Sequence, residues 1–329
     1  MLLSILTDGL GHLSFEQMLD AAVALKVKGL EITCGGWSSA PHMDADLLLR
    51  NAAERKDYMQ KISDHDLEIC ALNASGNPLC PGELGRKHAA DVEKTIRLAG
   101  EMGVESVVLQ SGTPGATAND AYPMWITCPF PTTLLDVLEH QWNDIAIPYW
   151  SNVADLAKEC GVKKIAFENF GMNLCYNVDT LLRMRKAVGP IIGMNLDPSH
   201  MFHMNAEPIA AARALGLENA IHHVHAKDTR FNPEMANING TNFLTDFFDV
   251  PLHLRSWNYV AVGYGHDELW WRRFFATLSN LGYDGPVSLE IEDASMDAFS
   301  AHEQSIKVLN NSMPCKRKDS EIFDKSTFA

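Results

Sequence analysis

Four ionisable residues each follow a short apolar run in the second half of the chain. They are Glu168 in IAFEN, Asp197 in MNLDPSH, His225 in HHVHAKD and Glu290 in SLEIED. One carboxylate at a strand end usually caps a helix or forms a salt bridge, but four in succession indicate a shared site. A buried carboxylate must be paired or metal-bound, because its isolated burial is costly. Three carboxylates and one imidazole form a hard, anionic set that suits Mn²⁺ or Mg²⁺, with Co²⁺ or Zn²⁺ as alternatives.

Further candidates lie near these four residues or in a long connection before them. Lys227 and Arg230 follow His225 directly, where they can bind substrate hydroxyl groups. His140 lies in LEHQW, with Trp142 beside it. An imidazole titrates near neutral pH, so we expect His140 to overhang the pocket as a general base and Trp142 to contact the substrate. A surface histidine is the alternative.

The elements that must position these residues alternate between short apolar runs and longer amphipathic stretches. Strands are expected at 2–6, 29–34, 67–73, 105–111, 163–169, 191–197, 220–226 and 286–292. Eight strands that alternate with helices predict a parallel sheet, and eight βα units are the number of a (β/α)8 barrel. We expect one barrel domain over 1–312 and a polar tail over 313–329. A doubly wound open sheet is the alternative, but no glycine-rich phosphate motif follows a strand.

Two βα connections, the fourth and the seventh, are long. They run from about 112 to 145 and from about 229 to 265. Long ordered loops in compact domains are usually functional, and active sites of such barrels lie at the carboxyl ends of the strands. Both connections are rich in apolar side chains, namely Tyr122, Trp125, Phe130 and Trp142 in one and Phe243, Phe247, Phe248, Leu254, Trp257 and Tyr259 in the other. These side chains suit a flat aglycone or a sugar face, and equally a subunit interface.

Composition excludes several classes of protein. The formal net charge of −15 argues against a nucleic-acid surface, which needs clustered Lys and Arg. We find no apolar run long enough to span a membrane and no signal peptide in the first twelve residues. The seven cysteines are odd in number and lack CxxC spacing, so we expect reduced thiols in a cytoplasmic protein.

The segments IAFEN, NLDPSHM, HVHAKD and SLEIED resemble the metal-site strands of the xylose-isomerase-like barrel superfamily. That group includes ketose 3-epimerases, inosose dehydratases, hydroxypyruvate isomerases and the catalytic subunits of C-glycoside deglycosidases. The resemblance implies a set of four metal ligands, Glu168, Asp197, His225 and Glu290, and a substrate contact at His200. The chain looks most similar to the deglycosidase subunits, which implies a smaller β-rich partner subunit and an oligomer.

A divalent ion beside a sugar carbonyl acts as a Lewis acid and assists removal of a neighbouring proton. We expect β-elimination from a 3-keto-glycoside, with His140, Glu168 and Glu290 as the catalytic residues. A sugar isomerase or epimerase is the alternative, with Glu168 and Glu290 as paired acid and base. Ketose 3-epimerases carry another glutamate shortly after the first ligand, whereas the stretch 169–175, NFGMNLC, has no carboxylate. A DNA-repair endonuclease on this barrel would need more histidines and a basic groove.

Overall fold

The computed structural model describes residues 1–241 and 249–314, and its centre is a closed barrel of eight parallel strands. Around the barrel they follow the order β1-β10-β7-β6-β5-β4-β3-β2. Their bounds are β1 Leu2–Leu6, β2 Gly29–Thr33, β3 Glu68–Asn73, β4 Ser106–Leu109, β5 Lys164–Glu168, β6 Ile192–Leu196, β7 Ile221–Ala226 and β10 Pro286–Leu289. The pairing of β1 with β10 closes the barrel and sets Ser4 beside Ser288. The predicted (β/α)8 barrel and all eight strand positions are confirmed.

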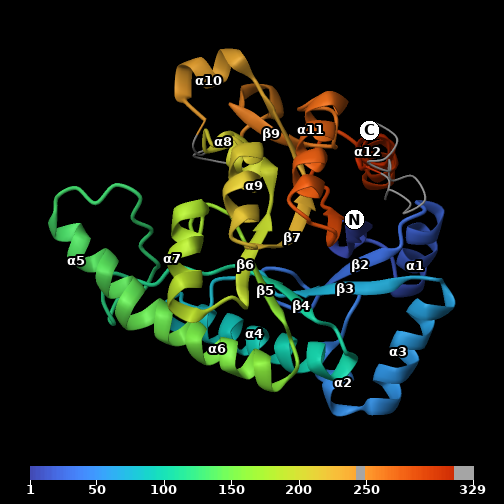
Figure 1. The fold of residues 1–329 in the computed structure, drawn as a ribbon, viewed down its shortest axis with the longest axis horizontal. Coiled ribbons are helices and arrows are strands. Elements are labelled where there is room, and N and C mark those ends of the chain that lie inside the picture. Colours follow the sequence, from blue (N-terminus) through green and yellow to red (C-terminus); the bar gives the residue numbers. More distant parts are fainter. Residues whose placement is uncertain (242–248, 315–329) are drawn as a thin grey trace, which may run out of the picture.

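Helices cover the outside of this barrel (Figure 1). They are α1 Phe15–Ala24, α2 Ala45–Arg50, α3 Ala52–Asp64, α4 Gly82–Met102, α5 Thr133–His140, α6 Ile147–Glu159, α7 Val178–Val188, α8 Pro198–His203, α9 Pro208–Leu217, α10 Pro233–Asn239, α11 Glu268–Asn280 and α12 Ala298–Ser312. Short 3₁₀ or π turns are η1 Thr7–Leu10, η2 Gln141–Ala146 and η3 Leu252–Leu254. Local sequence sets several of these bounds. Ser14 caps α1 in a capping box, and Gly103 ends α4 in the left-handed region at φ 71°.

The barrel interior differs from the layer between strands and helices. That layer is apolar and contains large buried side chains such as Trp150, Trp271 and Phe167. Inside the barrel, only Ala71, Val108 and Ala166 form a small separate apolar cluster. Polar side chains fill other inward positions, including Ser4, Glu31, Asn195, His223 and Ser288, all with 0% exposure. Ser4, Ser288, His223 and Glu31 are joined by hydrogen bonds of 2.8–2.9 Å, whereas the buried amide of Asn195 makes none among the described residues.

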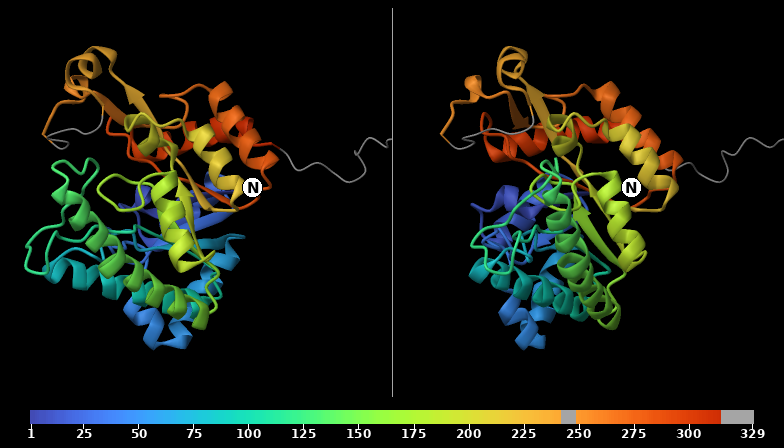
Figure 2. Two further views of the ribbon diagram at one scale, coloured as in Figure 1. Left: turned by 60° about the vertical axis from the view of Figure 1, so that its left-hand side comes forward. Right: turned by 90° about the vertical axis from the view of Figure 1, so that its left-hand side faces the viewer.

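The two long connections are built differently. The fourth carries α5 and η2, which run on into α6, so that one helical segment crosses the outside of the barrel (Figure 2). The seventh forms a two-stranded antiparallel sheet of β8 Asp228–Phe231 and β9 Trp257–Val260, with α10 between them. In Figure 1, α10 and this ribbon lie at the top of the molecule. Phe243, Phe247 and Phe248 lie outside the described residues, as does most of the expected 313–329 tail.

Two further expectations concern membrane-spanning helices and the oxidation state of the cysteines. No helix among residues 1–241 and 249–314 is long and apolar enough to cross a membrane. The cysteines within the same ranges are all free thiols, and Cys315 lies beyond them.

Asp228 anchors the ribbon of the seventh connection to the barrel. Its side chain is fully buried, and one oxygen, Oδ2, accepts hydrogen bonds from the backbone N–H groups of Gly263, Gly265 and His266 at 3.0, 3.1 and 2.9 Å. The other oxygen accepts from the N–H of Thr229 at 2.8 Å. One carboxylate therefore joins the start of β8 to the turn that follows β9.

Asp228→Asn should destabilise the protein by about 2–4 kcal/mol, because an amide nitrogen would replace an oxygen that accepts buried N–H groups. Urea denaturation at pH 7 measures this loss. Asp267→Asn is the matched control, since Asp267 caps α11 by accepting from the N–H of Trp270 and asparagine caps helices equally well. Equal stabilities of the two variants would contradict the anchoring role.

Candidate metal centre

The four predicted ligands converge at the carboxyl ends of neighbouring strands. Glu168 ends β5, Asp197 follows β6, His225 lies in β7 and Glu290 follows β10. Each residue offers one ligand atom, and these atoms all lie within 4.8 Å of one another. Glu168, Asp197 and His225 are buried, and the side chain of Glu290 is 13% exposed. The structure thus brings together the residues that the strand-end pattern selected.

The atoms that face one another in this cluster fit a divalent cation. Nδ1 of His225 lies 2.8 Å from Oε2 of Glu290 and 3.3 Å from Oε1 of Glu168. An ion with bonds of about 2.0–2.2 Å holds neighbouring ligand atoms roughly 2.8–3.6 Å apart. Nδ1 of His225, Oε2 of Glu290 and Oδ2 of Asp197 are buried and make no hydrogen bond among the described residues. Such a set of unsatisfied, mutually close acceptors is what a metal ion completes.

A further carboxylate outside the four-residue cluster, Glu31 on β2, fixes the orientation of His225. Its oxygens lie 3.0 and 3.1 Å from Nε2 of His225, so this nitrogen carries the proton and Nδ1 is left to bind the ion. Glu31 also accepts from Nδ2 of Asn73 at 2.7 Å and lies 2.8 Å from Nε2 of His223. Burial opposes the charge of Glu31, but the charges of His225 and His223 hold its pKa well below the ordinary value. His223 is itself fully buried in the barrel interior.

The remaining oxygens of Glu168 and Glu290 have different partners. Oε2 of Glu168 accepts from the amide of Gln110 at 2.9 Å. Oε1 of Glu290 accepts from the ammonium of Lys227 at 2.9 Å, and Lys227 also lies 2.6 Å from Oε2 of Glu292. Burial opposes the charge of Lys227, but Glu290 and Glu292 raise its pKa well above the ordinary value. A neutral amide therefore supports one carboxylate and a cation supports the other.

His200 lies beside the cluster, as the resemblance implies. Its Nδ1 is 2.8 Å from the hydroxyl of Tyr259, and its Nε2 is 3.2 Å from Oδ2 of Asp197 and 3.4 Å from Oε1 of Glu168. Burial disfavours the imidazolium, but the charge of the nearby Asp197 carboxylate raises the pKa of His200 to about 9. The ring is thus a second positive group at the anionic site.

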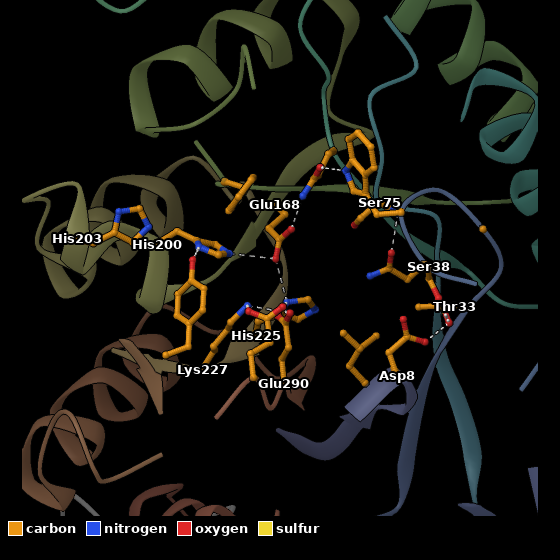
Figure 3. A pocket seen from close by; sticks show the side chains of 18 of the residues that line it. Asp8, Thr33, Ser38, Ser75, Glu168, His200, His203, His225, Lys227 and Glu290 are labelled. Atoms are coloured by element: carbon orange, nitrogen blue, oxygen red, sulfur yellow. Dashed lines mark hydrogen bonds and ion pairs between the residues drawn. The ribbon is translucent and has the colours of Figure 1, made fainter. Parts of the chain in front are cut away.

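A cavity of about 470 Å³ opens above the cluster and has two different walls. Glu168, His200, His225, Lys227 and Glu290 form one wall, and Figure 3 shows Asp8, Thr33, Ser38 and Ser75 facing them across an open space. Trp257 and Tyr259, from the ribbon of the seventh connection, also line the cavity. The volume lies within the range of about 300–1,000 Å³ that is typical of small-molecule sites.

Three predicted residues are not at this cavity. His140 ends α5 with its side chain 41% exposed, and its Nδ1 lies 2.7 Å from Oδ2 of Asp144. Trp142 is 2% exposed and lines a separate pocket of about 210 Å³, where the guanidinium of Arg183 lies 4.5 Å from its ring centre. The α5–η2–α6 segment carries both residues past the outside of the barrel. Arg230 is exposed on β8 and does not line the cavity either.

The aromatic residues of the fourth connection do not reach the cavity. Tyr122 and Phe130 are 80% and 81% exposed, and Trp125 shares the separate pocket with Trp142. In the seventh connection, Leu254 is 46% exposed and does not line the cavity, unlike Trp257 and Tyr259.

Sequence analysis missed several residues of the site, of which Glu31, Trp37 and Gln110 matter most. Glu31 could have been found, because a glutamate in the middle of the apolar strand GLEITC must be buried and therefore paired. Trp37 and Gln110 lie in the loops after β2 and β4, and nothing in their sequence positions distinguishes them from ordinary loop residues.

Comparison with known proteins identifies the family. Residues 19–312 match the family described as Xylose isomerase-like TIM barrel. The chain belongs to this family. The uncharacterized protein YfiH of Bacillus subtilis (strain 168) is 48% identical over 318 residues, which cover 95% of this chain and 99% of YfiH.

Two solved structures show the same barrel at low sequence identity. IolI, solved with a bound zinc atom, has a TM-score of 0.65 and 17% identity over 96% of this chain and 100% of its own. The probable 3-DHS dehydratase AsbF of Bacillus anthracis has a TM-score of 0.64 and 17% identity over 94% of this chain and 99% of its own.

Protein purified without chelator should contain about one equivalent of a divalent metal, measured by inductively coupled plasma mass spectrometry. Asp197→Asn should lower this content, because an amide is a weaker ligand for a hard cation than a carboxylate, and excess ion should partly restore it. Asp267→Asn, far from the cluster on the helix α11 cap, should keep the wild-type content. An Asp197→Asn protein with unchanged metal affinity would contradict the assignment.

Glu31→Gln should weaken metal binding roughly 10–100-fold, because the imidazole of His225 loses the carboxylate that orients it. Isothermal titration with Mn²⁺ measures the change. Glu68→Gln at the exposed start of the adjacent strand β3 removes the same charge and should leave the affinity unaltered. Two equivalents in the wild-type protein would instead mean that Glu31, His223 and His225 hold an ion of their own.

Proposed function

We propose that this protein is a divalent-metal-dependent lyase that removes a proton beside the carbonyl of a keto-glycoside and eliminates the substituent on the next carbon. The observation that carries the proposal is the unequal support of two oxygens: Oε2 of Glu168 accepts from a neutral amide, whereas Oε1 of Glu290 accepts from an ammonium. Two carboxylates that exchange protons reversibly on opposite faces of a sugar would need similar surroundings. Unequal surroundings favour one group that takes a proton and another that gives one.

Glu168, Asp197, His225 and Glu290 would hold the ion, with Mn²⁺ as our proposal for its identity. When bound, it would polarise the substrate carbonyl as a Lewis acid and stabilise the charge that develops on the oxygen. The zinc atom in IolI shows that a barrel of this shape can hold a divalent ion.

The chain's own residues supply the proton transfers. Oε2 of Glu168 keeps a free lone pair beside its bond from Gln110, so it can accept the proton from the carbon next to the carbonyl. The electron pair of that C–H bond forms a carbon–carbon double bond, and the bond to the substituent breaks with its own electron pair. The ammonium of Lys227 then donates a proton to the departing atom. Solvent removes the proton from Glu168 and returns one to Lys227.

A sugar isomerase or epimerase remains the alternative, with Glu168 and Glu290 as the acid–base pair. Residues 169–175 lack the additional glutamate of ketose 3-epimerases, which argues against 3-epimerisation. AsbF is a probable dehydratase, and dehydration is also an elimination, which supports the lyase proposal. A smaller β-rich partner subunit and an oligomeric state also remain proposals, to be tested by co-purification and light scattering.

Manganese-loaded protein should release the substituent from methyl and phenyl 3-keto-β-D-glucopyranosides, detected by mass spectrometry after incubation in D₂O. D-Fructose and D-tagatose should remain unchanged, because they lack a good leaving group beside the activated carbon. Sugars that keep their mass apart from one incorporated deuterium, with no release from the glycosides, would establish the isomerase or epimerase instead.

Lys227→Met should slow release of the substituent roughly 10²–10⁴-fold, since departure loses its proton donor. Exchange of the neighbouring hydrogen with D₂O should persist, because Glu168 is untouched. Arg230→Met removes the same charge from an exposed position three residues away and should react at the wild-type rate. If Lys227→Met retains its metal but loses exchange and release together, Lys227 is the base and this division of roles is wrong.

A further inference from the structure

Trp37 is a large aromatic residue that is exposed and yet held in place. It lines the cavity with 58% of its surface exposed. Its backbone N–H donates to the carbonyl of Ser75 at 2.8 Å, and its ring packs against the ring of His88 at 4.5 Å, nearly at right angles. An exposed tryptophan that only fills a loop does not need such restraint, so the restraint indicates a binding role.

The loop that carries Trp37 has no room to shift. Gly35 and Gly36 adopt φ values of +152° and +73°, which other residues rarely adopt. A Cβ atom on Gly36 would lie 2.1 Å from the carbonyl oxygen of Ser75. The N–H of Gly36 donates to Oδ2 of Asp91 at 3.1 Å. Two glycines and two hydrogen bonds therefore set the position of the indole before any ligand arrives.

The indole is connected directly to the metal centre. Its Nε1–H donates to Oε1 of Gln110 at 3.0 Å, and Nε2 of Gln110 donates to Oε2 of Glu168 at 2.9 Å. Only one side chain thus lies between the indole and the proposed base. Because the one polar atom of the ring is already bonded, the surface left to the cavity is apolar. A ligand can contact it only through a flat or apolar face.

In contrast to the apolar face of the indole, the other groups near Trp37 in the cavity are polar. The hydroxyls of Ser38 and Thr33 lie 3.2 Å apart, and Thr33 donates to the carboxylate of Asp8. Oγ of Ser75 is buried with no hydrogen-bond partner among the described residues. Hydroxyl-binding groups beside a fixed apolar surface are suited to a molecule that carries both ring faces and hydroxyl groups.

We propose that Trp37 is a binding platform for a second ring of the substrate, attached to the sugar whose carbonyl faces Glu168 and Glu290. This rests on the proposed function, which it deepens by requiring a ring-bearing substituent. The shared chemistry of that substituent is a flat or apolar ring face, supplied by an aryl group or by a second sugar. A free ketose would leave the platform empty.

Isothermal titration of manganese-loaded protein tests the platform with three probes: the methyl and phenyl 3-keto-β-D-glucopyranosides, and the disaccharide in which C1 of the same 3-keto-glucosyl group is linked to O4 of glucose. The wild-type protein should bind a ring-bearing probe roughly 10–100-fold more tightly than the methyl probe. Trp37→Ala should abolish that preference, measured as the ratio of the ring-bearing to the methyl affinity within the same variant, whereas Trp37→Phe should retain most of it. Tyr122→Ala, an exposed aromatic residue away from the cavity, is the control and should behave like the wild type.

The outcomes separate this proposal from the proposed function. Preference for the phenyl probe indicates an aryl group, and preference for the disaccharide probe indicates a second sugar. A wild-type protein that binds neither more tightly than the methyl probe overturns the platform, as does a Trp37→Ala protein that keeps the preference. If ring preference depends on Trp37 but no substituent is released, the platform stands and the lyase fails. If release occurs without a ring preference, the lyase stands and the platform fails.

Discussion

Electrostatic repulsion among three carboxylates is the constraint around which the barrel end is organised. Glu168, Asp197 and Glu290 contribute oxygens within 4.8 Å of one another, where water cannot fully screen them. Positive groups surround this charge, since His200 and Lys227 each contact one or more of the three. A divalent ion would neutralise what remains. Stability and metal affinity are therefore linked, because the ion binds only the folded arrangement.

The ligand cluster also determines which residues fill the barrel interior below it. Strand alternation places His223 beneath His225 and Ser288 beneath Glu290, so the layer under the ligands is polar as well. Glu31 extends into this layer, where its carboxylate pairs with Nε2 of both histidines. An apolar residue at that position would leave the Nε2–H group of His225 buried and unpaired, while His223 would keep only its contact with the hydroxyl of Ser288. The polar layer thus exists because the ligands above it need fixed orientations.

The strand pattern predicted the barrel and the ligand cluster, because alternation and strand ends are local properties of the sequence. Lys227 was predicted because it follows a ligand at the strand exit, whereas His200 was implied by the resemblance to the family. His140 and Trp142 were misplaced because the path of a thirty-residue connection depends on tertiary packing. The π turn at Gln141–Ala146 and the helix after it carry both along the outside, which sequence spacing alone does not reveal.

Which residues of other strands pair with the ligands could not be predicted for a related reason, even where burial alone marked one of them, Glu31, as paired. Gln110, Glu31 and Trp37 belong to the first half of the chain, whereas every ligand lies in the second half. The closed barrel brings the halves together, so Glu31 reaches His225 from across the ring and Gln110 reaches Glu168 from the end of the neighbouring strand β4. The hydrogen-bond series from Trp37 through Gln110 to Glu168 is one result. A ring that binds against the indole lies against the same series that holds the proposed base. Under the proposed function, a single amide side chain would link ring binding at Trp37 to proton abstraction by Glu168.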